Sequence, residues 1–318
     1  MSTQLRPIDA RAYESHVLHA TERSWTETNC YVDLWIEVLH ALGAEPLAAC
    51  AFTLSAGFEA DQWTFIKVPP EDLRSLFGIE IGELAVWRPI PDHIDEHLGA
   101  GQLLTVEVDS WFLPDTQGTS YRSEHVKTTI VPQMIDRDGR RLGYFHNAGY
   151  FELEGEDYAG LFAPVALPPY VELVKLDRFD PRPSDLAARS AVLAAEHLAR
   201  RPSSNPVAEM AARLQADLPW LVEQGLDAFH QYAFVTVRQC GACAELAASY
   251  VEWLEASADL APSKAAQSLH ALADGAKSLQ FGLARVARGR QYDIAPALAE
   301  MERSWDDAMA ELGRHHGG

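Results

Sequence analysis

The residue best placed for chemistry in this sequence is Cys30. It opens the run C-Y-V-D-L-W-I-E-V-L-H-A-L-G, whose apolar residues recur at helical spacing. We expect a helix that Thr28 or Asn29 caps and that Gly43 and Pro46 end. A helix N-terminus stabilises a thiolate, the reactive form of cysteine, through its dipole and free N–H groups. The position therefore predicts a nucleophile of low pKa, and the alternative is an inert, buried thiol.

The acidic residues of the same helix indicate which way the thiol points. Asp33 and Glu37 follow Cys30 by three and seven positions, so the three side chains share one helical face. The apolar residues lie on the other side of the helix. We therefore expect Cys30 to lie on a polar edge that borders a cleft, not on the buried stripe.

A cysteine nucleophile needs a base, and the base needs an orienting group. His40 is excluded, because ten residues along one helix separate it from Cys30 by about 15 Å. His125 follows the loop L-P-D-T-Q-G-T-S-Y-R-S-E and begins a predicted strand. We predict that His125 is the base, and an ordinary surface histidine is the alternative.

A hairpin supplies the orienting group. The D-R-D-G turn at 136–139 joins two predicted strands, and Pro132 predicts a bulge in the first. This register places Asn147 opposite His125, so we predict that Asn147 orients the imidazole. His146 is the second choice, because strand alternation points it to the other face. The alternative for Asn147 is a polar strand residue bound to a loop backbone.

Other residues are weaker candidates. Asp109, Asp115 and Asp61, together with Tyr121, are predicted to bind a substrate ammonium, with solvated or capping carboxylates as the alternative. The C-G-A-C run at 240–243 has redox or zinc spacing. Because the chain has no second C-x-x-C, we expect it to pack at a helix start and predict no metal site. Trp25, Trp35, Trp63 and Trp111 are expected in the core.

Composition and charge bound the function classes. The chain has 318 residues and a net charge of −20, and residues 1–160 carry 11 basic against 26 acidic residues. An acidic chain without a basic stripe argues against nucleic acid as the main partner. Apolar runs stay well below the roughly 18 residues of a membrane span, the start lacks a signal peptide, and four cysteines form no secreted framework. We expect a cytoplasmic protein with no membrane partner.

Periodicity predicts two domains of different class. Residues 1–160 mix helices near 70–77 and 91–98 with a strand at 103–113 and another from His125. Residues 161–183 are rich in proline and predict a linker. Residues 184–318 show helical periodicity alone. The predicted fold is α+β: a catalytic domain of helix and antiparallel sheet, then an α-helical bundle.

The chain also resembles a known family along nearly its whole length. The blocks that carry the resemblance are E-T-N-C-Y-V-D-L-W-I-E-V-L-H-A-L-G, F-E-A-D-Q-W-T-F-I-K, V-E-V-D-S-W-F-L-P-D-T, H-V-K-T-T-I, L-G-Y-F-H-N-A-G-Y-F-E-L and, in the bundle, R-Q-C-G-A-C-A-E-L and K-S-L-Q-F-G-L-A-R. They resemble a bacterial family of unassigned function. Its members typically occur beside carrier proteins and aminoacyl ligases that are similar to seryl-tRNA synthetases.

A more distant resemblance concerns mechanism. The blocks V-D-S-W-F-L-P-D-T and H-V-K-T-T-I are similar to the butirosin acyltransferase BtrH, itself similar to papain-like bacteriocin-leader peptidases. This resemblance implies a papain-like domain that transfers an acyl or aminoacyl group from a carrier-protein thioester to a small amine through an acyl-cysteine. It implies Cys30, His125 and Asn147 as nucleophile, base and orienting residue. A cysteine hydrolase and a non-catalytic carrier-binding accessory are the alternatives.

The resemblance leaves the oxyanion hole unassigned. The peptidases place a Gln six residues before the cysteine, and here that position is Ser24. The candidates are the backbone N–H of Cys30 and the side chains of Asn29 and Ser24. No cofactor is expected on the protein itself, because the phosphopantetheine arm of the carrier is part of the substrate.

An acidic carrier protein needs a cationic surface on this acidic chain. Arg285 and Arg288 are spaced i,i+3 near a predicted helix end, and Arg290 follows Gly289. We predict that these three arginines receive the carrier. Arg137, Arg140 and Arg141 at the hairpin turn are the second candidate, and solvated arginines at a helix end are the alternative.

Overall fold

The computed structural model describes residues 2–65, 67–164, 166–259 and 261–315. It divides into two compact units, each built from more than one stretch of chain. The sheet unit comprises Met1–Ala20, Asn29–Pro46 and Val68–Pro183. The helical unit comprises Thr21–Thr28, Leu47–Lys67 and Ser184–Gly318. The predicted combination of an antiparallel sheet with a C-terminal helical region is confirmed, although the chain passes between the units more often than predicted.

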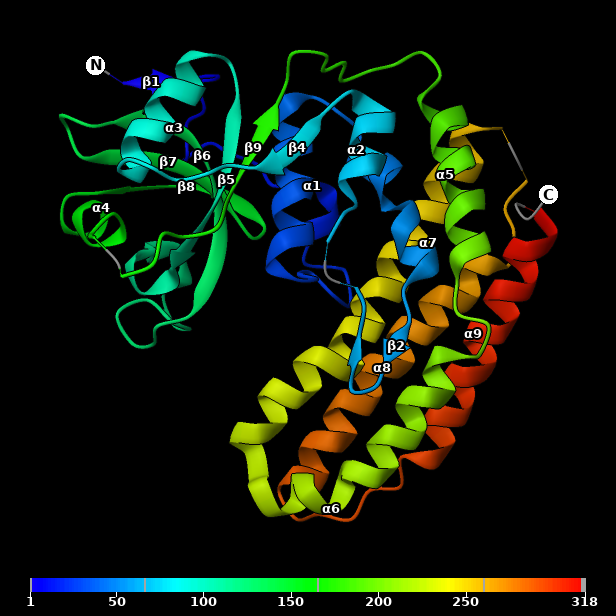
Figure 1. The fold of residues 1–318 in the computed structure, drawn as a ribbon. Helices are drawn as coiled ribbons and strands as arrows, with labels where there is room; N and C mark the ends of the chain where they lie inside the picture. The colour runs from blue at the N-terminus through cyan, green and yellow to red at the C-terminus, as the bar shows by residue number, and fades with distance from the viewer. Residues whose placement is uncertain (1, 66, 165, 260, 316–318) are drawn as a thin grey trace. The chain divides into compact units, whose positions relative to one another are not determined.

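The sheet unit contains most of the short elements (Figure 1). In chain order they are β1 (Thr3–Gln4), η1 (Val17–His19), α1 (Cys30–Leu42), α2 (Pro70–Phe77), β4 (Glu80–Glu83), α3 (Ile90–Gly99), β5 (Leu103–Asp109), η3 (Ser110–Phe112), η4 (Pro114–Thr116), β6 (Lys127–Asp136), β7 (Arg141–His146), β8 (Gly149–Glu154), α4 (Glu156–Leu161) and β9 (Val171–Lys175).

Helix α1 begins and ends as the sequence predicts. The side chain of Asn29 accepts hydrogen bonds from the backbone N–H groups of Tyr31 and Val32 and so caps the helix. Gly43 ends it in the left-handed conformation, with a φ of 81° that favours glycine. Cys30 is therefore the first residue of α1.

The sheet is antiparallel, in the strand order β4-β9-β5-β6-β7-β8, and β1 pairs with β6. Helix α1 packs against β6, β7 and β8, and α3 packs against β5 and β6. The bulge predicted from Pro132 is present, because the register of β6 against β7 shifts between Pro132 and Met134. A bulge of one residue moves the β6–β7 register by one position. The prediction that Asn147 lies opposite His125 required a larger shift.

Two expectations about the sheet are wrong in detail. The strand predicted over 103–113 ends at Asp109, where the Asp109 side chain accepts from the backbone N–H of Trp111 and starts the 3-10 turn η3. The predicted linker 161–183 contains β9, which pairs with both β4 and β5. The prolines of this segment lie before and after β9, so no proline interrupts the strand itself.

The helical unit consists of long helices with a small hairpin. Its elements are η2 (Pro46–Ser55), β2 (Phe58–Glu59), β3 (Gln62–Trp63), α5 (Leu186–Arg200), α6 (Pro206–Ala233), the π-helical η5 (Phe234–Arg238), α7 (Gln239–Ser257), α8 (Ala265–Ala287) and α9 (Ala295–His315). Helix α8 packs against α7, α9 and α6, and these four helices run side by side in Figure 1.

The segment before α1 belongs to the helical unit because Trp25 is inserted into it. The indole N–H of Trp25 donates to the carbonyl of Ala273, and Lys277 lies 4.3 Å above the ring. A Cβ at Gly241 would approach the indole to 2.4 Å, so α7 needs a glycine there. Trp25, Trp35 and Trp63 are buried, as expected for core residues. None of the helices within the described ranges is long and apolar enough to cross a membrane.

Candidate active site

Cys30 lies at the surface of the sheet unit, at the N-terminus of α1. Its thiol interacts with the side chain of Thr128, near the start of β6. Burial raises the pKa of the Cys30 thiol above its ordinary value, and the charge of Asp33 adds to the rise. The interaction with Thr128 and the charge of Lys127 oppose it without cancelling it. The expectation of a low thiol pKa is therefore wrong, and Cys30 needs a base to become a thiolate.

The polar edge of α1 does not border a cleft, which corrects the second expectation. Asp33 and Glu37 are buried, and both contact His19, whose Nδ1 lies 2.5 Å from Glu37 Oε1 and whose Nε2 lies 3.3 Å from Asp33 Oδ1. The hydroxyl of Tyr13 donates to Glu37 as well. Tyr13 and His19, in the N-terminal part of the sheet unit, thus cover these carboxylates.

This cluster changes the pKa of His19. Burial by itself lowers the pKa, but the hydrogen bonds and charges of Asp33 and Glu37 outweigh burial and raise it to about 9. His19 is therefore charged near neutral pH and compensates one of the two buried carboxylates. The role of the cluster is to hold the acidic face of α1 inside the protein.

A buried histidine is hydrogen-bonded to Thr128. Thr128 Oγ1 lies 2.8 Å from His146 Nε2, and His146 Nδ1 lies 2.5 Å from Asp115 Oδ2. The hydroxyl of Tyr144 also donates to Asp115, at 2.5 Å. The side chains of His146 and Asp115 are only 2% and 3% exposed. We call Thr128, His146 and Asp115 the buried relay.

The hydrogen bonds of the buried relay are consistent with one assignment of donors and acceptors. Asp115 accepts from His146 Nδ1–H, so the proton of a neutral ring is on Nδ1 and Nε2 is an acceptor. Thr128 then donates its hydroxyl proton to Nε2, and its oxygen can accept from the Cys30 thiol. The relay can therefore take a proton from Cys30 and place it on His146 beside a buried carboxylate.

The predicted base, His125, lies in a different environment. It stands two residues before β6, its Nδ1 lies 2.5 Å from Asp109 Oδ2, and its ring stacks on Trp111 with centroids 4.5 Å apart. Asp109 and Lys127 are directly opposed in the β5–β6 ladder, as are Val108 and Thr128. Because opposed residues point the same way and neighbours alternate, Asp109 and Thr128 lie on opposite sides of the ladder. We call His125 and Asp109 the exposed pair.

Asn147 lies in the turn between β7 and β8, not in a strand. The β7–β8 register pairs His146 with Gly149, so Asn147 and Ala148 form a two-residue turn, and Asn147 has a φ of 45°. Asparagine tolerates this left-handed conformation, which such turns require. The recorded partner of the His125 ring is Asp109 and not Asn147. Turn geometry thus accounts for Asn147 without a role in orienting His125.

The oxyanion candidates have structural tasks. The side-chain oxygen of Asn29 is used in capping α1. Ser24 belongs to the helical unit, where its hydroxyl donates to Asp274 at 2.7 Å and its backbone N–H donates to Glu245. The third candidate donor is the backbone N–H of Cys30. It is directed at the sulfur of the same residue.

The four residues predicted to bind an ammonium fall into separate groups. Asp115 is part of the buried relay, and Asp109 is part of the exposed pair. The hydroxyl of Tyr121 donates to Asp157 at 2.9 Å, and Asp157 and Asp115 line one pocket, so Tyr121 and Asp115 lie near each other. Asp61 lies in the turn between β2 and β3, in the helical unit.

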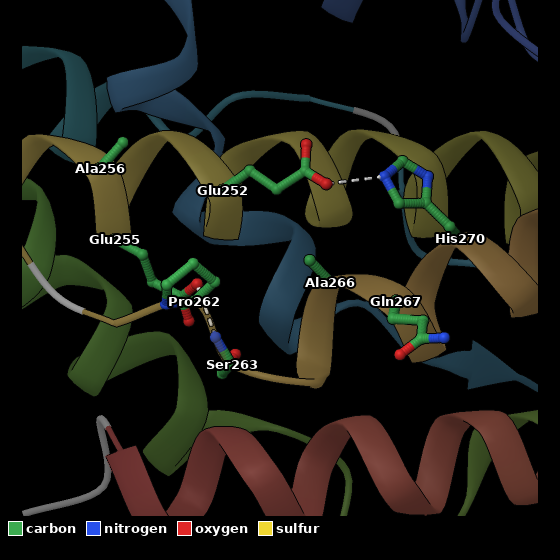
Figure 2. Close-up of a pocket in the computed structure, with 8 residues that line it drawn as sticks. All are labelled: Glu252, Glu255, Ala256, Pro262, Ser263, Ala266, Gln267 and His270. Atoms are coloured by element: carbon green, nitrogen blue, oxygen red, sulfur yellow. Dashed lines mark hydrogen bonds and ion pairs between the residues drawn. The ribbon is translucent and has the colours of Figure 1, made fainter.

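The helical unit has a pocket of about 410 Å³ between α7 and α8, drawn in Figure 2. Its polar groups have partners: Glu252 lies 3.1 Å from His270 Nε2, and Glu255 accepts from the backbone N–H of Ser263 at 3.0 Å.

Cys240 and Cys243 lie inside α7 and are buried, and burial raises the pKa of both thiols. Among the described residues, no group of three or more His, Cys, Asp or Glu could hold a metal ion.

The sequence prediction did not include Thr128, gave His146 only as a second choice and placed Asp115 among the residues expected to bind an ammonium. The available signal was the nearly symmetrical run L-G-Y-F-H-N-A-G-Y-F-E-L, in which Asn147 and Ala148 separate two β-like segments. Reading that pair as a turn places His146 at the end of a strand, at the same edge as the start of β6. Asp115 lies in a loop, where no periodicity indicates a partner.

The arrangement of a helix-borne cysteine with a strand-borne histidine suits acyl transfer through the thiol. In comparisons with known sequences, a family model described as the DUF1839 N-terminal domain matches residues 14–176. A second, described as the DUF1839 C-terminal domain, matches residues 183–314. No curated protein matches the chain. The two matches cover most of the sequence, and the chain belongs to the DUF1839 family, whose function is unknown.

Proposed function

We propose that this protein is a cysteine-dependent acyltransferase of papain-like organisation. The observation that carries the proposal is a path of side chains: Thr128 acts on the Cys30 thiol and is hydrogen-bonded to the buried pair of His146 and Asp115. A thiol of raised pKa is a poor nucleophile without a base, and this path supplies one. In this proposal His146 has the role that the sequence assigned to His125.

The first half-reaction forms an acyl-cysteine. The thiol proton of Cys30 passes to Thr128 while the Thr128 hydroxyl proton passes to His146 Nε2. The sulfur attacks the carbonyl carbon of a thioester, and the C–S bond to the donor breaks. The departing thiolate takes a proton from the imidazolium, through Thr128 or directly. Asp115 stabilises the imidazolium while it exists.

The second half-reaction transfers the acyl group to an amine. The amine nitrogen attacks the acyl-cysteine carbonyl, the bond to Cys30 breaks, and an amide forms with release of the thiol. Exchange between thioesters is nearly balanced in free energy, and amide formation then drives the transfer. The protein has to position the reactants and exclude water, because water as acceptor makes the protein a hydrolase.

The proposed donor is the phosphopantetheine arm of an acidic carrier protein. Arg285, Arg288 and Arg290 are exposed at the end of α8, where Arg288 caps the helix and Gly289 has a φ of 72°. Two of the three alternative arginines are engaged: Arg137 pairs with Asp92, and Arg141 pairs with Glu152. Within the described ranges, no ion pair is recorded for the three arginines of α8, so they are the preferred docking surface.

Acylation of Cys30 tests the function. We expect p-nitrophenyl acetate to acetylate Cys30 in a burst seen by intact mass and peptide mapping, and we expect hydroxylamine to remove the acetyl group. Cys30→Ser is the control for other nucleophiles. Adding a primary amine should then convert the acyl-cysteine into an amide faster than water hydrolyses it. Hydrolysis unaffected by amines would indicate a hydrolase, and absence of the adduct would indicate an accessory protein.

Docking is tested with two matched double variants. Arg285→Glu with Arg288→Glu should weaken binding of an acidic carrier protein by about 10-fold or more near physiological salt, because close charge reversal costs several kcal/mol. It should also reduce the loss of affinity as salt rises. Arg137→Glu with Arg141→Glu makes the same charge change at the hairpin. If only the hairpin variant weakens binding, the carrier docks there instead.

A further inference from the structure

The exposed pair borders an apolar pocket of the sheet unit. The pocket has a volume of about 680 Å³, within the range of small-molecule sites. Its walls are mainly apolar, and its polar lining residues are His125, Asp109, Glu107, Lys127 and Arg88, of which Arg88 is paired with Glu96. An apolar pocket with a few converging polar groups has the usual composition of a binding site.

The pocket extends to the side of the sheet that carries Thr128. Val108 and Val126 line the pocket, and strand alternation places both on the same side as Thr128, whereas His125 and Asp109 are on the other side. The pocket therefore passes around the end of the β5–β6 ladder. The side of His125 and Asp109 is the side that faces α1, because Thr105, on the same side of β5 as Asp109, donates to Glu172, which also accepts from Tyr31 of α1. A ligand in the pocket can therefore contact His125 on the side of the sheet that carries α1.

Lys127 connects the pocket to the thiol. It lines the pocket, it precedes Thr128, and its charge acts on the Cys30 thiol, whose pKa it lowers. Lys127 is also paired with Glu107 at 2.7 Å, so neither charge is left for an ionic ligand. The field of the surrounding chain is negative, since residues 1–160 have a net charge of −15. The field favours a cationic ligand over an anionic one.

The orientation of His125 suits proton removal from a ligand. Asp109 occupies Nδ1, which places the proton of a neutral ring there and leaves Nε2 as the acceptor. Stacking on Trp111 holds the ring plane. An amine that attacks an acyl-cysteine must lose a proton, and a positioned imidazole with a carboxylate partner is a suitable base.

We infer that this pocket binds a primary amine with an apolar body, the acceptor of the acyl group, and that His125 takes the amine proton. The inference rests on the proposed function. In the step, the amine nitrogen bonds to the acyl carbon, the C–S bond to Cys30 breaks, and the nitrogen's proton moves to His125 Nε2. The thiolate recovers a proton from solvent.

Binding is tested first without catalysis, in Cys30→Ser, with 2-phenylethylamine as the probe. Calorimetry should show it binding about 10-fold more tightly than 3-phenylpropanoate, which has a similar body and the opposite charge. Ala163→Trp fills the pocket from an exposed lining position and should weaken binding by about 10-fold or more. Ala166→Trp, in the same loop but outside the lining, should bind as the parent does.

Equal binding of the anion, no binding, or equal loss in both tryptophan variants would overturn the inference. The role of His125 is tested by His125→Gln in the otherwise unaltered chain. Transfer of acetyl from Cys30 to 2-phenylethylamine should fall by about 10²-fold, with acetylation of Cys30 changed by less than about 3-fold. An equal fall in both steps would overturn it too.

The two proposals fail in different ways. If Cys30 is never acylated but Cys30→Ser binds 2-phenylethylamine as expected, the acyltransferase proposal fails and the amine pocket stands. If Cys30 is acylated but the pocket binds no amine, the acceptor proposal fails alone.

Discussion

The sheet unit contains two histidine–aspartate pairs with the same contact and different surroundings. In each, Nδ1 of the histidine lies 2.5 Å from Oδ2 of the aspartate. The side chains of His146 and Asp115 are 2% and 3% exposed, whereas those of His125 and Asp109 are 68% and 36% exposed. The buried pair is hydrogen-bonded to Thr128, and the exposed pair borders a pocket.

The difference shows that the contact alone does not define the role of a pair. Solvent screens the charges of the exposed pair, so it contributes little to stability and its histidine can exchange protons with ligands and water. The buried pair is held by Thr128 and Tyr144 and keeps one tautomer. A fixed tautomer suits a dedicated base for one thiol, and an accessible ring suits a base for an exchangeable substrate.

Removing the aspartates should separate the pairs most strongly. Asp115→Ala leaves the buried donors of His146 and Tyr144 without an acceptor, so we expect a loss of about 3–5 kcal/mol in the free energy of unfolding. Urea denaturation near pH 7 measures it, and Asp115→Asn, which keeps an acceptor oxygen, should lose less. A loss below about 1 kcal/mol for Asp115→Ala would mean that burial does not distinguish the pairs.

A third histidine tests whether burial with carboxylates governs stability. The pKa of His19 is raised from 6.5 to about 9, so its charge stabilises the fold fully below about pH 6.5, and this contribution is lost as the pH rises to about 9. The shift corresponds to about 3 kcal/mol. We expect the urea midpoint to fall between these pH values, and His19→Gln should remove most of the fall. If the pH dependence of the urea midpoint is unchanged in His19→Gln, the charge of His19 is not its cause.

The link between the buried pair and Cys30 is Thr128. Thr128→Val keeps the shape but removes the hydroxyl, so acylation of Cys30 should slow by about 10²-fold. Stopped-flow release of p-nitrophenolate measures the rate. Thr128→Ser restores the hydroxyl and should recover most of the rate. Equal rates in the valine and serine variants would show that the hydroxyl transfers no proton.

The smallest effect is expected from the exposed pair. Asp109→Ala should change the free energy of unfolding by less than about 1 kcal/mol, because solvent screens this ion pair. The same urea titration at low and high salt checks it. A loss of stability comparable with that of Asp115→Ala would mean that the different surroundings of the two pairs do not give them different roles.

Local signals in the sequence predicted much of the fold. Helix α1 has an Asn cap, a periodic apolar stripe and a terminal glycine, and the D-R-D-G turn joins β6 to β7 where expected. The limits came from long-range pairing. Strand β9 joins the sheet through β4 and β5, which are distant in the sequence, and Trp25 enters the helical unit because Gly241 leaves room for it.

The candidate site was only partly predictable for a physical reason. Cys30 can be recognised in the sequence from its place at a helix start. The choice between His125 and His146 depends on which side of the sheet each side chain occupies. That side follows from where β6 begins and from the turn at Asn147, and an error of one residue reverses it. Asp115 contacts His146 through the fold of a loop, which carries no periodic signal.

The central claim is that the buried pair, and not the exposed one, deprotonates Cys30. The most direct test compares the acylation rate of Cys30 by p-nitrophenyl acetate in His146→Gln and His125→Gln, with folding of each confirmed by circular dichroism. The account predicts a fall of about 10²-fold or more for His146→Gln and less than about 3-fold for His125→Gln. The reverse order, or equal rates in both, would contradict it.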